Sequence, residues 1–490
     1  MHKRSRRHGA PPRKSRRWLW LAGVSLTLSA AVAGGVLYFL NDLGITPRSL
    51  GPYIKRRSDG HNAVIEGIGQ AASKVLLYVD RGDPPYRQAE WASSIGVQAG
   101  GSPDAGAANG QEVLVSTTPE MVRAIAAATP GQVITLLPGR YQVDQRVTVI
   151  KPGSADAPIT VRARQPGSVQ LMIDAGEGFN IQAPYWRFEN LSLQGNCSKN
   201  TYCEHAFHVA GGAHHFAAVN NTIVDFDAHF KINGEKGRIP DHGLIASNTL
   251  RNNSIRLTTK PVTPVDLVAA SHWVIRRNLI SDFIKGDSDL ISYGAFVKGG
   301  GGNNVLEQNI VICEHKLRGA PGQRIGLSLG GGGTGKQYCR DGRCLTEQTG
   351  SVLRSNLIAG CSDDGIYLNA SAQSKLVHNT LVDTGGITVR FPESSADIEG
   401  NLVDGIIRSR DGGVLRLADN RHVSAARLYF GGHPQRALFR DPLALDFHWS
   451  TPAERRVAAG EPVPDLCGAV RPGQPRYGAF EDFAACLAKR

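Results

Sequence analysis

The most regular feature of the chain is a short phrase in which an apolar residue precedes two variable positions, an Asn and a further apolar pair. Residues 275–280 and 353–358 are clear copies. The Asn residues of successive copies lie 19 to 47 residues apart, and they are Asn190, Asn221, Asn248, Asn278, Asn309, Asn356, Asn379, Asn401 and Asn420. A period of this size indicates a repeat architecture in which each unit is one supersecondary element.

The spacing predicts a parallel β-helix, because the last few intervals approach the length of one of its coils. An Asn at an inward bend can hydrogen-bond to its equivalents one coil above and below, at a strand spacing of about 4.8 Å. The apolar residues after the anchors are expected to stack into one core: Ile223, Leu250, Ile280, Val311, Ile358, Leu381 and Val403. A leucine-rich solenoid and an antiparallel sandwich remain alternatives, although leucine-rich repeats keep a stricter unit length.

The segment before the repeats predicts a cap for the first coil. Residues 118–128 begin with Thr118, Pro119 and Glu120, which supply a cap residue, a first-turn proline and a first-turn acid for a helix. A strand is expected over residues 131–141. A helix that covers the first coil would protect the open edge of a stacked solenoid.

Together with the end of the chain, these features resemble the right-handed parallel β-helix proteins of the pectate-lyase-like superfamily. The resemblance covers residues 112–481, and its C-terminal part rests on residues 439–442, 446–447, 465–468, 471–472 and 477–481. It implies an all-β, single-stranded right-handed parallel β-helix with an N-terminal capping helix. Members include polysaccharide lyases, glycoside hydrolases, uronate epimerases and non-catalytic proteins, so the resemblance specifies fold more narrowly than activity.

The N-terminal region predicts a membrane anchor. Residues 1–17 form a basic tail, and residues 18–40 are uncharged and long enough to span a bilayer. Positive charge before the span predicts a single-pass protein of the inner membrane, with a cytoplasmic N-terminus and a periplasmic or otherwise extracytoplasmic body. A signal peptide cleaved near Ala33 and a twin-arginine signal at Arg16 and Arg17 are alternatives. Residues 41–111 are expected to form a stem and a Gly/Ala/Ser-rich flexible linker, and residues 482–490 a C-terminal tail.

The net charge of +12 lies almost entirely at the N-terminus. Residues 1–57 carry twelve Lys and Arg against one acid, whereas the remaining 433 residues carry 43 basic and 42 acidic groups. The neutral body argues against nucleic-acid binding. Residues 330–336 resemble a phosphate-binding loop, but Gln337 replaces the required Ser or Thr, so no nucleotide partner is expected.

The eight cysteines are expected to form disulfides, because the compartment beyond the membrane is oxidising. Cys313 and Cys361 follow their anchors by four and five residues, which would place them on adjacent coils. The other expected pairs are Cys197 with Cys203, Cys339 with Cys344, and Cys467 with Cys486. Metal binding is the alternative, but the sequence contains no CxxC or His-x-x-x-His spacing.

Titratable residues at similar offsets from the anchors form a candidate catalytic site. Equal offsets place residues on the same edge of adjacent coils, about 5 Å apart. Catalysis on an acidic sugar polymer requires a Lys, His or Arg base near a neutralised carboxylate. The expected catalytic residues are Lys231, Lys285, His315, Lys316, Asp363 and Asp364. The same column could instead be a solvated ladder of ion pairs.

Long intervals between anchors indicate loops, and loops on a rigid scaffold usually carry the functional sites. These loops contain a group of histidines, namely His205, His208, His214, His215 and His242. Their basic residues are expected to bind substrate: Lys236, Arg238, Lys298, Arg318 and Arg324. Calcium is a possible cofactor, with oxygen ligands from Asp287, Asp289 and Glu314.

Two further resemblances concern the activity. Asp363-Asp364-Gly365 and Asp241-His242-Gly243 are similar to parts of a polygalacturonase-type hydrolase site, although their order is reversed. Residues 381–391 resemble the chondroitinase B and alginate lyase branch, although the His-Gly that should follow Arg390 is absent.

The sequence therefore predicts a protein that acts on a uronate-containing polysaccharide by proton abstraction of the lyase or epimerase type. A non-catalytic glycan-binding or cell-envelope scaffold is one alternative, and a glycoside hydrolase is another. An enzyme requires a site where predicted groups converge within a few ångströms, whereas a scaffold requires only an open charged face. At least two of the following should then meet: Lys231, Lys285, Lys298, His315, Lys316 and Asp363.

Overall fold

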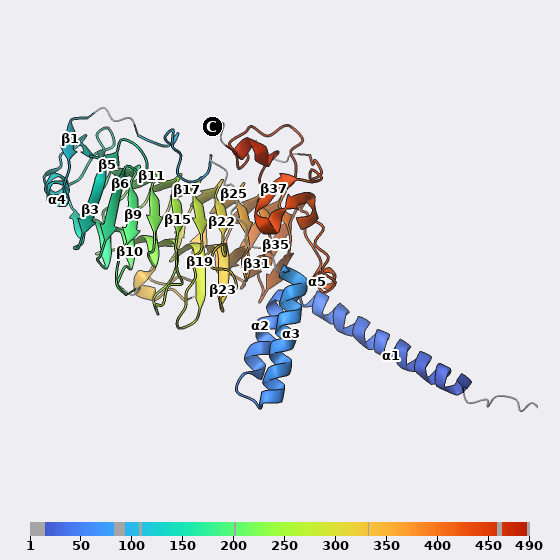
Figure 1. Cartoon of the computed structure of the whole chain (residues 1–490). Coiled ribbons are helices and arrows are strands. Elements are labelled where there is room, and N and C mark those ends of the chain that lie inside the picture. Colours follow the sequence, from blue (N-terminus) through green and yellow to red (C-terminus); the bar gives the residue numbers. More distant parts are fainter. Residues whose placement is uncertain are drawn as a thin grey trace, which may run out of the picture.

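Parallel strands wound into successive coils form the body of the protein (Figure 1). The structure is a computed structural model that describes residues 15–82, 94–106, 110–199, 202–331, 333–457 and 463–487. Each full coil contributes one strand to each of three stacked sheets, which we name A, B and C. Neighbouring strands within each sheet are parallel, which confirms the predicted β-helix.

The three sheets differ in the number and length of their strands. Sheet A contains β1 (Glu112–Val115), β2 (Val133–Leu136), β5 (Ile159–Ala163), β8 (Trp186–Glu189), β11 (Ala217–Val219), β14 (Leu244–Ala246), β17 (Val274–Arg276), β21 (Val305–Glu307), β25 (Val352–Arg354), β29 (Ser374–Val377), β32 (Ser395–Glu399) and β35 (Val414–Leu417). Sheet B contains β3 (Gly139–Val143), β6 (Val169–Ile173), β9 (Ser192–Gly195), β12 (Thr222–Val224), β15 (Thr249–Arg251), β18 (Leu279–Ser281), β22 (Ile310–Ile312), β26 (Leu357–Ala359), β30 (Thr380–Val382) and β33 (Leu402–Val403). Sheet C contains β4 (Val147–Val149), β7 (Glu177–Ile181), β10 (His205–Ala210), β13 (Ala228–Asn233), β16 (Val265–Val268), β19 (Ile291–Lys298), β23 (Gln323–Leu329), β27 (Ile366–Asn369), β31 (Gly386–Arg390) and β34 (Ile406–Arg410). Two small sheets contain β20 (Gly301–Gly302), β24 (Gln348–Thr349) and β28 (Ser371–Ala372), and β36 (Phe439–Asp441) and β37 (Asp446–Trp449).

The core is a set of columns in which each coil places an equivalent side chain above the last. The seven apolar residues predicted to stack occupy directly paired positions in sheet B, and all are fully buried. A second column, in sheet C, stacks the rings of Phe179, Phe207 and Phe230 at centroid distances of 5.4 Å. Burial of these continuous columns is the main source of stability of the solenoid.

An asparagine ladder runs along the bend between sheets A and B. From Asn221 to Asn420, each side-chain amide donates to the Asn oxygen of the next coil over 2.9–3.0 Å. Asn190 is not part of this ladder, because the strand register aligns Leu191 with Asn221 and leaves Asn190 one position earlier. The residue before each ladder Asn from Asn221 to Asn401 has a positive φ, as at Ser247 and Gln308, and this left-handed residue turns the chain into the next sheet.

Removal of one ladder side chain tests its contribution. The Oδ1 atom of buried Asn309 accepts hydrogen bonds from both the backbone N–H and the side-chain amide of Asn278. We expect Asn309→Ala to lower the free energy of unfolding by about 1–3 kcal/mol, because both donors then remain buried without an acceptor. Asn253 is exposed, so Asn253→Ala is the matched control and should change the free energy of unfolding by less than about 0.5 kcal/mol. A denaturant titration of each variant measures both values. Equal losses in the two variants would contradict a structural role for the ladder.

The N-terminal end of the solenoid is capped as predicted. Helix α4 (Thr118–Ala127) has Thr117 at its N-cap, and Thr117 and Glu120 form a reciprocal capping box. Met121 and Ile125 of α4 are buried in the core of the first coils. The helix therefore closes the open end of the stack.

The chain after the last coil folds back over the outer face of sheet B. Phe439, Phe447, Phe480 and Phe483 form one apolar cluster with residues of that face such as Leu357. The segment includes the short helices α5 (Ala425–Leu428), η2 (Arg436–Leu438), η3 (Pro442–Ala444) and η4 (Phe483–Cys486); a further one, η1 (Lys336–Tyr338), lies in the longest inserted loop. The prediction of a separate tail from residue 482 is wrong for residues 482–487, and residues 488–490 lie outside the described residues.

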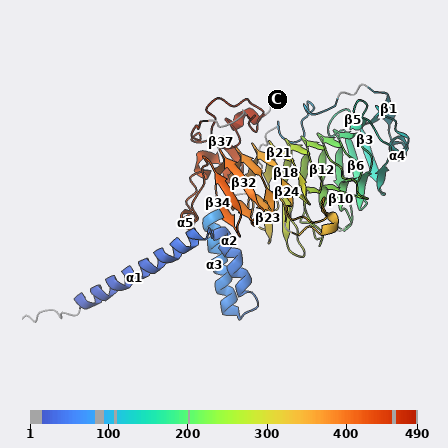
Figure 2. The same cartoon turned by 180° about the vertical axis from the view of Figure 1, so that it is seen from behind.

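Helix α1 (Ser15–Asp42) contains the expected apolar span. Its segment Gly23–Asp42 has a mean hydropathy of 1.7 over its most apolar part, none of which is buried, so by length and composition it could cross a membrane. It leaves the body as an isolated rod in Figures 1 and 2. A membrane anchor and a signal peptide both fit this helix, and the basic residues 1–14 lie outside the described residues.

The stem and linker predicted over residues 41–111 differ from the structure. Helices α2 (Pro47–Ser58) and α3 (Ala63–Arg81) form a hairpin at the C-terminal end of the solenoid (Figures 1 and 2). Residues 94–106 then run back along the Asn bend, where Gln98 binds Asn220, and Asp104 binds Arg276. This described part is an ordered strap rather than a flexible linker, because its polar groups pair with successive coils. Residues 83–93 and 107–109 lie outside the described residues.

All four predicted disulfides are present: Cys197–Cys203, Cys313–Cys361, Cys339–Cys344 and Cys467–Cys486. The Cys313–Cys361 bond joins two adjacent coils, as their offsets from Asn309 and Asn356 predicted.

Candidate functional site

The outward face of sheet C carries a row of polar residues on adjacent coils. The strand register pairs Asn180 with His208, His208 with Lys231, and Lys231 with Asp266. Side chains at paired positions of parallel strands point to the same face, about 4.8 Å apart. The fold therefore brings together residues that lie far apart in the sequence.

Two predicted lysines converge on one buried carboxylate in this row. Lys231 Nζ lies 2.5 Å from Asp266 Oδ2, and Lys298 Nζ lies 3.7 Å from Asp266 Oδ1. Both lysine side chains stay partly exposed, at 24% and 18%, whereas Asp266 is almost fully buried. Burial raises the pKa of Asp266, but the charges of the two lysines outweigh it and lower the pKa overall.

A histidine pair flanks the lysines. His208 Nδ1 lies 2.8 Å from Glu177, and its Nε2 lies 2.8 Å from Asn233. Burial lowers the pKa of His208, but the hydrogen bond and charge of Glu177 more than compensate, so the pKa is raised and the ring keeps its proton to a higher pH. Burial lowers the pKa of neighbouring His205 to about 4, which keeps its ring neutral at neutral pH.

We name Glu177, His205, His208, Lys231, Asp266 and Lys298 the sheet C cluster. The ammonium groups of Lys231 and Lys298 against the carboxylate of Asp266 leave one net positive charge at its centre. Two buried atoms of the cluster, His205 Nδ1 and Asp266 Oδ1, have no hydrogen-bond partner among the described residues. Lys298 also lies over the ring of Phe296, 4.0 Å from its centroid. A negatively charged group would be stabilised at this position.

The other predicted catalytic residues lie in the turns between sheets B and C. Lys285 follows β18, His315 and Lys316 follow β22, and Asp363 and Asp364 follow β26. Equal offsets thus identified equivalent turns. Lys285 pairs with Asp289 at 2.8 Å, and Asp363 accepts a hydrogen bond from Gln323. These contacts differ from one turn to the next, because the turns differ in length and conformation.

Of the neighbouring carboxyl groups of Asp363 and Asp364, Asp364 is buried and Asp363 is half-buried. Burial raises the pKa of Asp364 to about 7, and the neighbouring charge of Asp363 adds to this increase. An unfolded Asp loses its proton near pH 4, so the folded protein loses stability as the pH rises from about 4 to about 7.

We therefore expect Asp364→Asn to stabilise the protein relative to wild type at pH 8, by about 2–4 kcal/mol, and to have little effect at pH 4. Thermal unfolding at the two pH values measures the difference. The exposed Asp397→Asn is the control and should show no such gain at pH 8. An increase in stability of Asp364→Asn that is the same at both pH values would contradict the raised pKa of Asp364.

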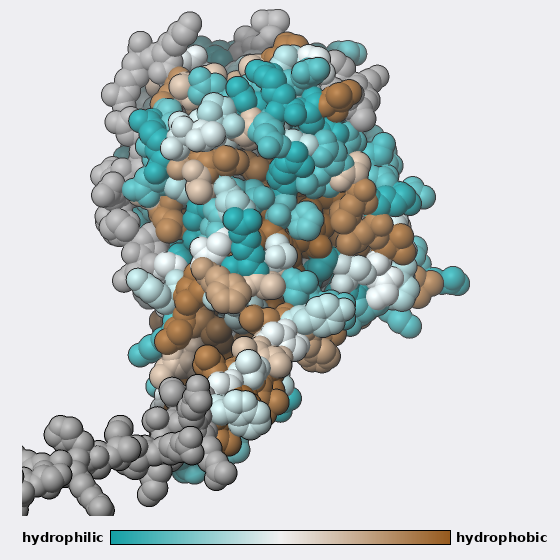
Figure 3. All heavy atoms as spheres, turned by 90° about the vertical axis from the view of Figure 1, so that its right-hand side faces the viewer, coloured by the Kyte–Doolittle hydropathy of each residue, from teal (hydrophilic) through white to brown (hydrophobic). Residues whose placement is uncertain are grey.

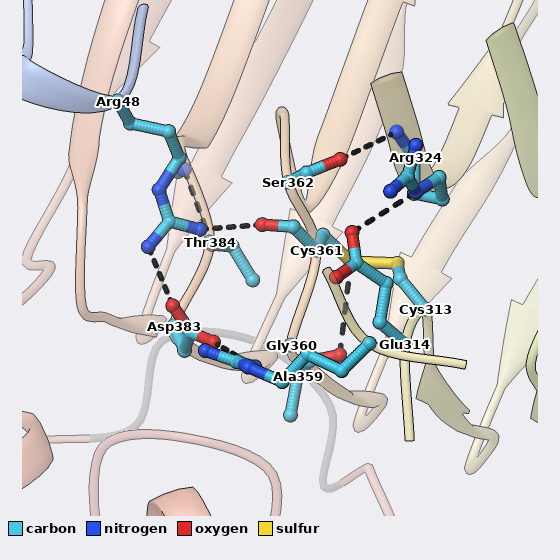
Figure 4. Close-up of a disulfide and its surroundings, with 12 residues drawn as sticks. Arg48, Cys313, Glu314, Arg324, Ala359, Gly360, Cys361, Ser362, Asp383 and Thr384 are labelled. Carbon is cyan, nitrogen blue, oxygen red and sulfur yellow. Dashed lines mark hydrogen bonds and ion pairs between the residues drawn. A yellow bond between two sulfur atoms is a disulfide. The ribbon is translucent and has the colours of Figure 1, made fainter. Parts of the chain in front are cut away.

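Two of the predicted substrate-binding residues are structural. Arg324 is fully buried, and its Nε lies 2.9 Å from Glu314 (Figure 4). Arg318 pairs with Asp383 at 2.9 Å. Both belong to a buried ion network that holds the helix hairpin. Arg48 of α2 reaches Asp80 and Asp383 at 2.5 and 2.6 Å, and Arg81 of α3 reaches Glu314 and Asp383.

Lys236 and Arg238 lie in the turn after β13, the strand that carries Lys231. Lys236 is highly exposed and lies 3.7 Å from Glu235, while Arg238 pairs through its backbone with the same Glu. These contacts keep both residues within their own turn, so their role in substrate binding stays a prediction.

The structure does not bring the three predicted calcium ligands together. Glu314 is enclosed by Arg324 and Arg81, Asp289 pairs with Lys285, and Asp287 binds the backbone N–H of Ser288. Within the described ranges, no group of three His, Cys, Asp or Glu side chains is arranged to hold a metal ion. These residues do not fit a calcium ion.

Two of the remaining loop histidines, His215 and His242, belong to an external stack. The rings of Tyr185, His215, His242 and His272 lie on successive coils, with centroids 4.7, 5.0 and 4.7 Å apart. Each of these residues has a positive φ, so they occupy the same bend of their coils. The stack lies at the bend between sheets C and A, and it is separate from the row of polar residues that includes Lys231.

Asp266 is the central residue that sequence reasoning missed. It lies in the run Val265–Val268, whose other members are apolar, and an isolated acid in a buried strand is a signal of an outward polar position. Its pairing with Lys231 could not be found, since an inserted loop separates the strands.

Comparisons with known proteins agree with this architecture. The chondroitinase B family profile matches residues 115–274, a range that includes Lys231 and Asp266 but not residues 381–391, where a resemblance to that branch was expected. A search of curated protein sequences finds no match.

Solved structures extend the similarity over most of the chain. The crystal structure of pectate lyase Pel9A superposes with a TM-score of 0.51 at 15% identity, covering 80% of this chain and 99% of the pectate lyase. An alginate lyase from Paenibacillus sp. covers 64% of this chain and 99% of its own, at 13% identity and a TM-score of 0.38. The A-module of the Azotobacter vinelandii mannuronan C-5 epimerase AlgE4 covers 62% and 93%, at 10% identity and a TM-score of 0.34. The similarity to the pectate lyase, together with the three parallel sheets, confirms the right-handed parallel β-helix fold.

Proposed function

We propose that the sheet C cluster binds a uronate unit of an acidic polysaccharide and that Lys231 removes the proton next to its carboxyl group. The observation that carries the proposal is the convergence of Lys231 and Lys298, from the first and third of three adjacent strands, on buried Asp266. An open charged face does not require such a buried carboxylate, whereas a catalytic site uses one to position its base. The chondroitinase B profile, which covers Lys231 and Asp266, and the pectate lyase fold support the choice of substrate.

The geometry suggests a role for each residue. Lys298 neutralises the uronate carboxylate, which acidifies the adjacent C5–H bond. Lys231, in its neutral form, takes the C5 proton. The C–H electron pair forms the C4–C5 double bond, and the C4–O bond breaks. His208, which holds its proton through Glu177, protonates the leaving oxygen. Asp266 is a positioning residue, because its carboxylate oxygens lie against the Nζ atoms of both lysines.

An epimerase would share the first step of this reaction. The carbanion would then be protonated on its opposite face, so that the C4–O bond stays intact and the uronate changes configuration. Both reactions need the same base and the same neutralised carboxylate.

The body of the protein would act outside the cytoplasm, held to a membrane by α1. Two observations support this location: the apolar segment Gly23–Asp42, and four disulfides that use all eight cysteines. Disulfides persist in oxidising compartments.

The test is product detection with the full-length protein in detergent. Alginate, pectate and glycosaminoglycans are offered separately, with added calcium and with a chelator. A lyase gives the ultraviolet absorbance of unsaturated uronates on at least one polymer, and an epimerase changes the uronate composition seen by NMR without that absorbance. Binding without either change would overturn the proposal in favour of a scaffold, and new reducing ends without unsaturation would overturn it in favour of a hydrolase.

A further inference from the structure

The helix hairpin packs through small residues and leaves its large apolar side chains outside. Gly69 of α3 lies against Ser58 of α2 so closely that an added Cβ would come within 2.0 Å of Ser58 Oγ. Gly51 of α2 meets Ser73 of α3 in the same way, at a less extreme distance. Close packing through small residues is typical of helix pairs in or near membranes, where apolar side chains need no protein partner.

The outer side of α3 is an apolar stripe. Val64, Ile68, Val75 and Tyr78 follow one another at intervals of three, four or seven residues, and their exposed fractions are 70, 65, 61 and 67%. This spacing places them on one face of the helix. We name these four residues the α3 stripe.

The stripe continues onto the body of the protein. A cavity of about 450 Å³ opens beside Tyr78, between α3 and the segment after α5, and its rim includes the exposed Phe430. Figure 3 views the molecule from the side toward which α1 runs in Figure 1, and hydrophobic surface gathers there at the height of α1 and the hairpin. The upper part of this face is mostly hydrophilic.

Basic residues border the same region. Lys55, Arg56 and Arg57 form the last turn of α2, and Lys74 lies beside the stripe on α3; all four are exposed. The acidic residues of the hairpin tip are Asp59, which pairs with Lys55, and Glu66. An amphipathic helix with an apolar face and a basic border is suited to an anionic membrane surface.

We propose that the α3 stripe lies in the headgroup region of the bilayer that holds α1, so that the hairpin is a second membrane contact. The proposal rests on α1 as a membrane span. Only a few residues separate α1 from α2, and Asn41, Gly44 and Ile45 bind the C-terminal part of the body, so the end of α1 and the hairpin lie side by side. Because the buried ion network fixes the hairpin to the last coils, two contacts with the bilayer would set the tilt of the solenoid and the direction in which the sheet C cluster faces.

Fluorescent probes in the full-length protein test this contact. All eight native cysteines are in disulfides, so an introduced cysteine is the only free thiol. Ile68→Cys and Val75→Cys place a polarity-sensitive dye on the stripe, and Gln70→Cys places it on another face of the same helix. Leu28→Cys reports on α1. Each protein is placed in nanodiscs that hold one copy, made of phosphatidylcholine and phosphatidylglycerol, with or without spin-labelled lipid as a quencher.

We expect lipid quenching at positions 68 and 75 to exceed that at position 70 by at least about two-fold, with strong quenching at position 28. Changing Lys55, Arg56 and Arg57 together to Gln should reduce quenching at position 68 in discs with phosphatidylglycerol and not in discs without it. Quenching at position 28 with none at 68 and 75 would overturn the hairpin contact, and no quenching at position 28 would overturn its premise.

A stripe that is shielded only when several copies are present would also overturn the proposal, since a second protein would then be its partner. Turnover in detergent is measured separately, so failure of the membrane contact and failure of the proposed catalytic function are distinguishable.

Discussion

Lys231→Arg is expected to abolish turnover of the polysaccharide while the protein still folds and binds it. Arginine keeps the positive charge that pairs with Asp266, but it cannot lose a proton at any pH at which the protein is folded, so it cannot serve as the base. Removal of a general base typically costs a factor of about 10²–10⁴ in rate. The measurement is kcat and KM on the polymer identified by the product screen.

Lys298→Arg is the matched control for this variant. Lys298 pairs with the same buried carboxylate, and its proposed role needs only a positive charge. The Lys298→Arg variant should therefore retain most of its kcat and show its effect mainly in KM. If the Lys231→Arg variant kept the turnover of the wild type, the assignment of Lys231 as the base would be contradicted. Loss of kcat at position 298 with full activity at 231 would reverse the two roles.

Asp383→Ala is expected to release the helix hairpin from the solenoid. Asp383 is buried and pairs with Arg48, Arg81 and Arg318 at 2.6, 3.3 and 2.9 Å. Burial raises the pKa of this carboxyl, but the surrounding guanidinium groups outweigh burial and hold it far below its usual range. Removal of one partner of a buried ion pair typically costs about 3–5 kcal/mol, because the remaining charges stay buried without compensation.

Hydrogen exchange followed by mass spectrometry should show the effect of Asp383→Ala first in α2 and α3, with the coils of the solenoid still protected. Asp397→Ala is the matched control, since Asp397 also pairs with an arginine, Arg416, but on the exposed surface. That variant should change stability by less than about 1 kcal/mol and leave the exchange of the hairpin unchanged. If the two variants behave alike, the network does not hold the hairpin.

The sequence was sufficient for those parts of the fold that depend on the repeat. Each ladder Asn, the core column from Ile223 to Val403, and the Cys313–Cys361 bond follow from residues at fixed positions within a coil. Asn190 was misplaced by one position because its phrase contains an Asn beside the ladder site, which only the strand register distinguishes.

The contacts of the hairpin could not be predicted in this way. Arg48 and Asp383 lie 335 residues apart, and no local pattern links them. The Gly, Ala and Ser residues that suggested a flexible linker instead let residues 94–106 approach the coils closely along the Asn bend. Arg318, Arg324 and Glu314 were interpreted as substrate and calcium ligands because buried ion pairs and functional sites use the same residue types.

Part of the candidate site could be predicted from the sequence. Lys231 and Lys298 were recognised as candidates, and an enzyme was expected to require that such groups converge. Asp266 completes the site only through the register of β13, β16 and β19. This register could not be predicted, because the loops between these strands differ in length.

The central claim is tested most directly by digestion of the polymer in water labelled with ¹⁸O, followed by mass spectrometry of the fragments. Elimination breaks the C4–O bond without adding water, so we expect fragments without label, whose masses sum to that of the parent and whose new non-reducing ends carry a C4–C5 double bond. Label at the new reducing ends, or the absence of both unsaturated fragments and altered uronates on every acidic polymer offered, would contradict it.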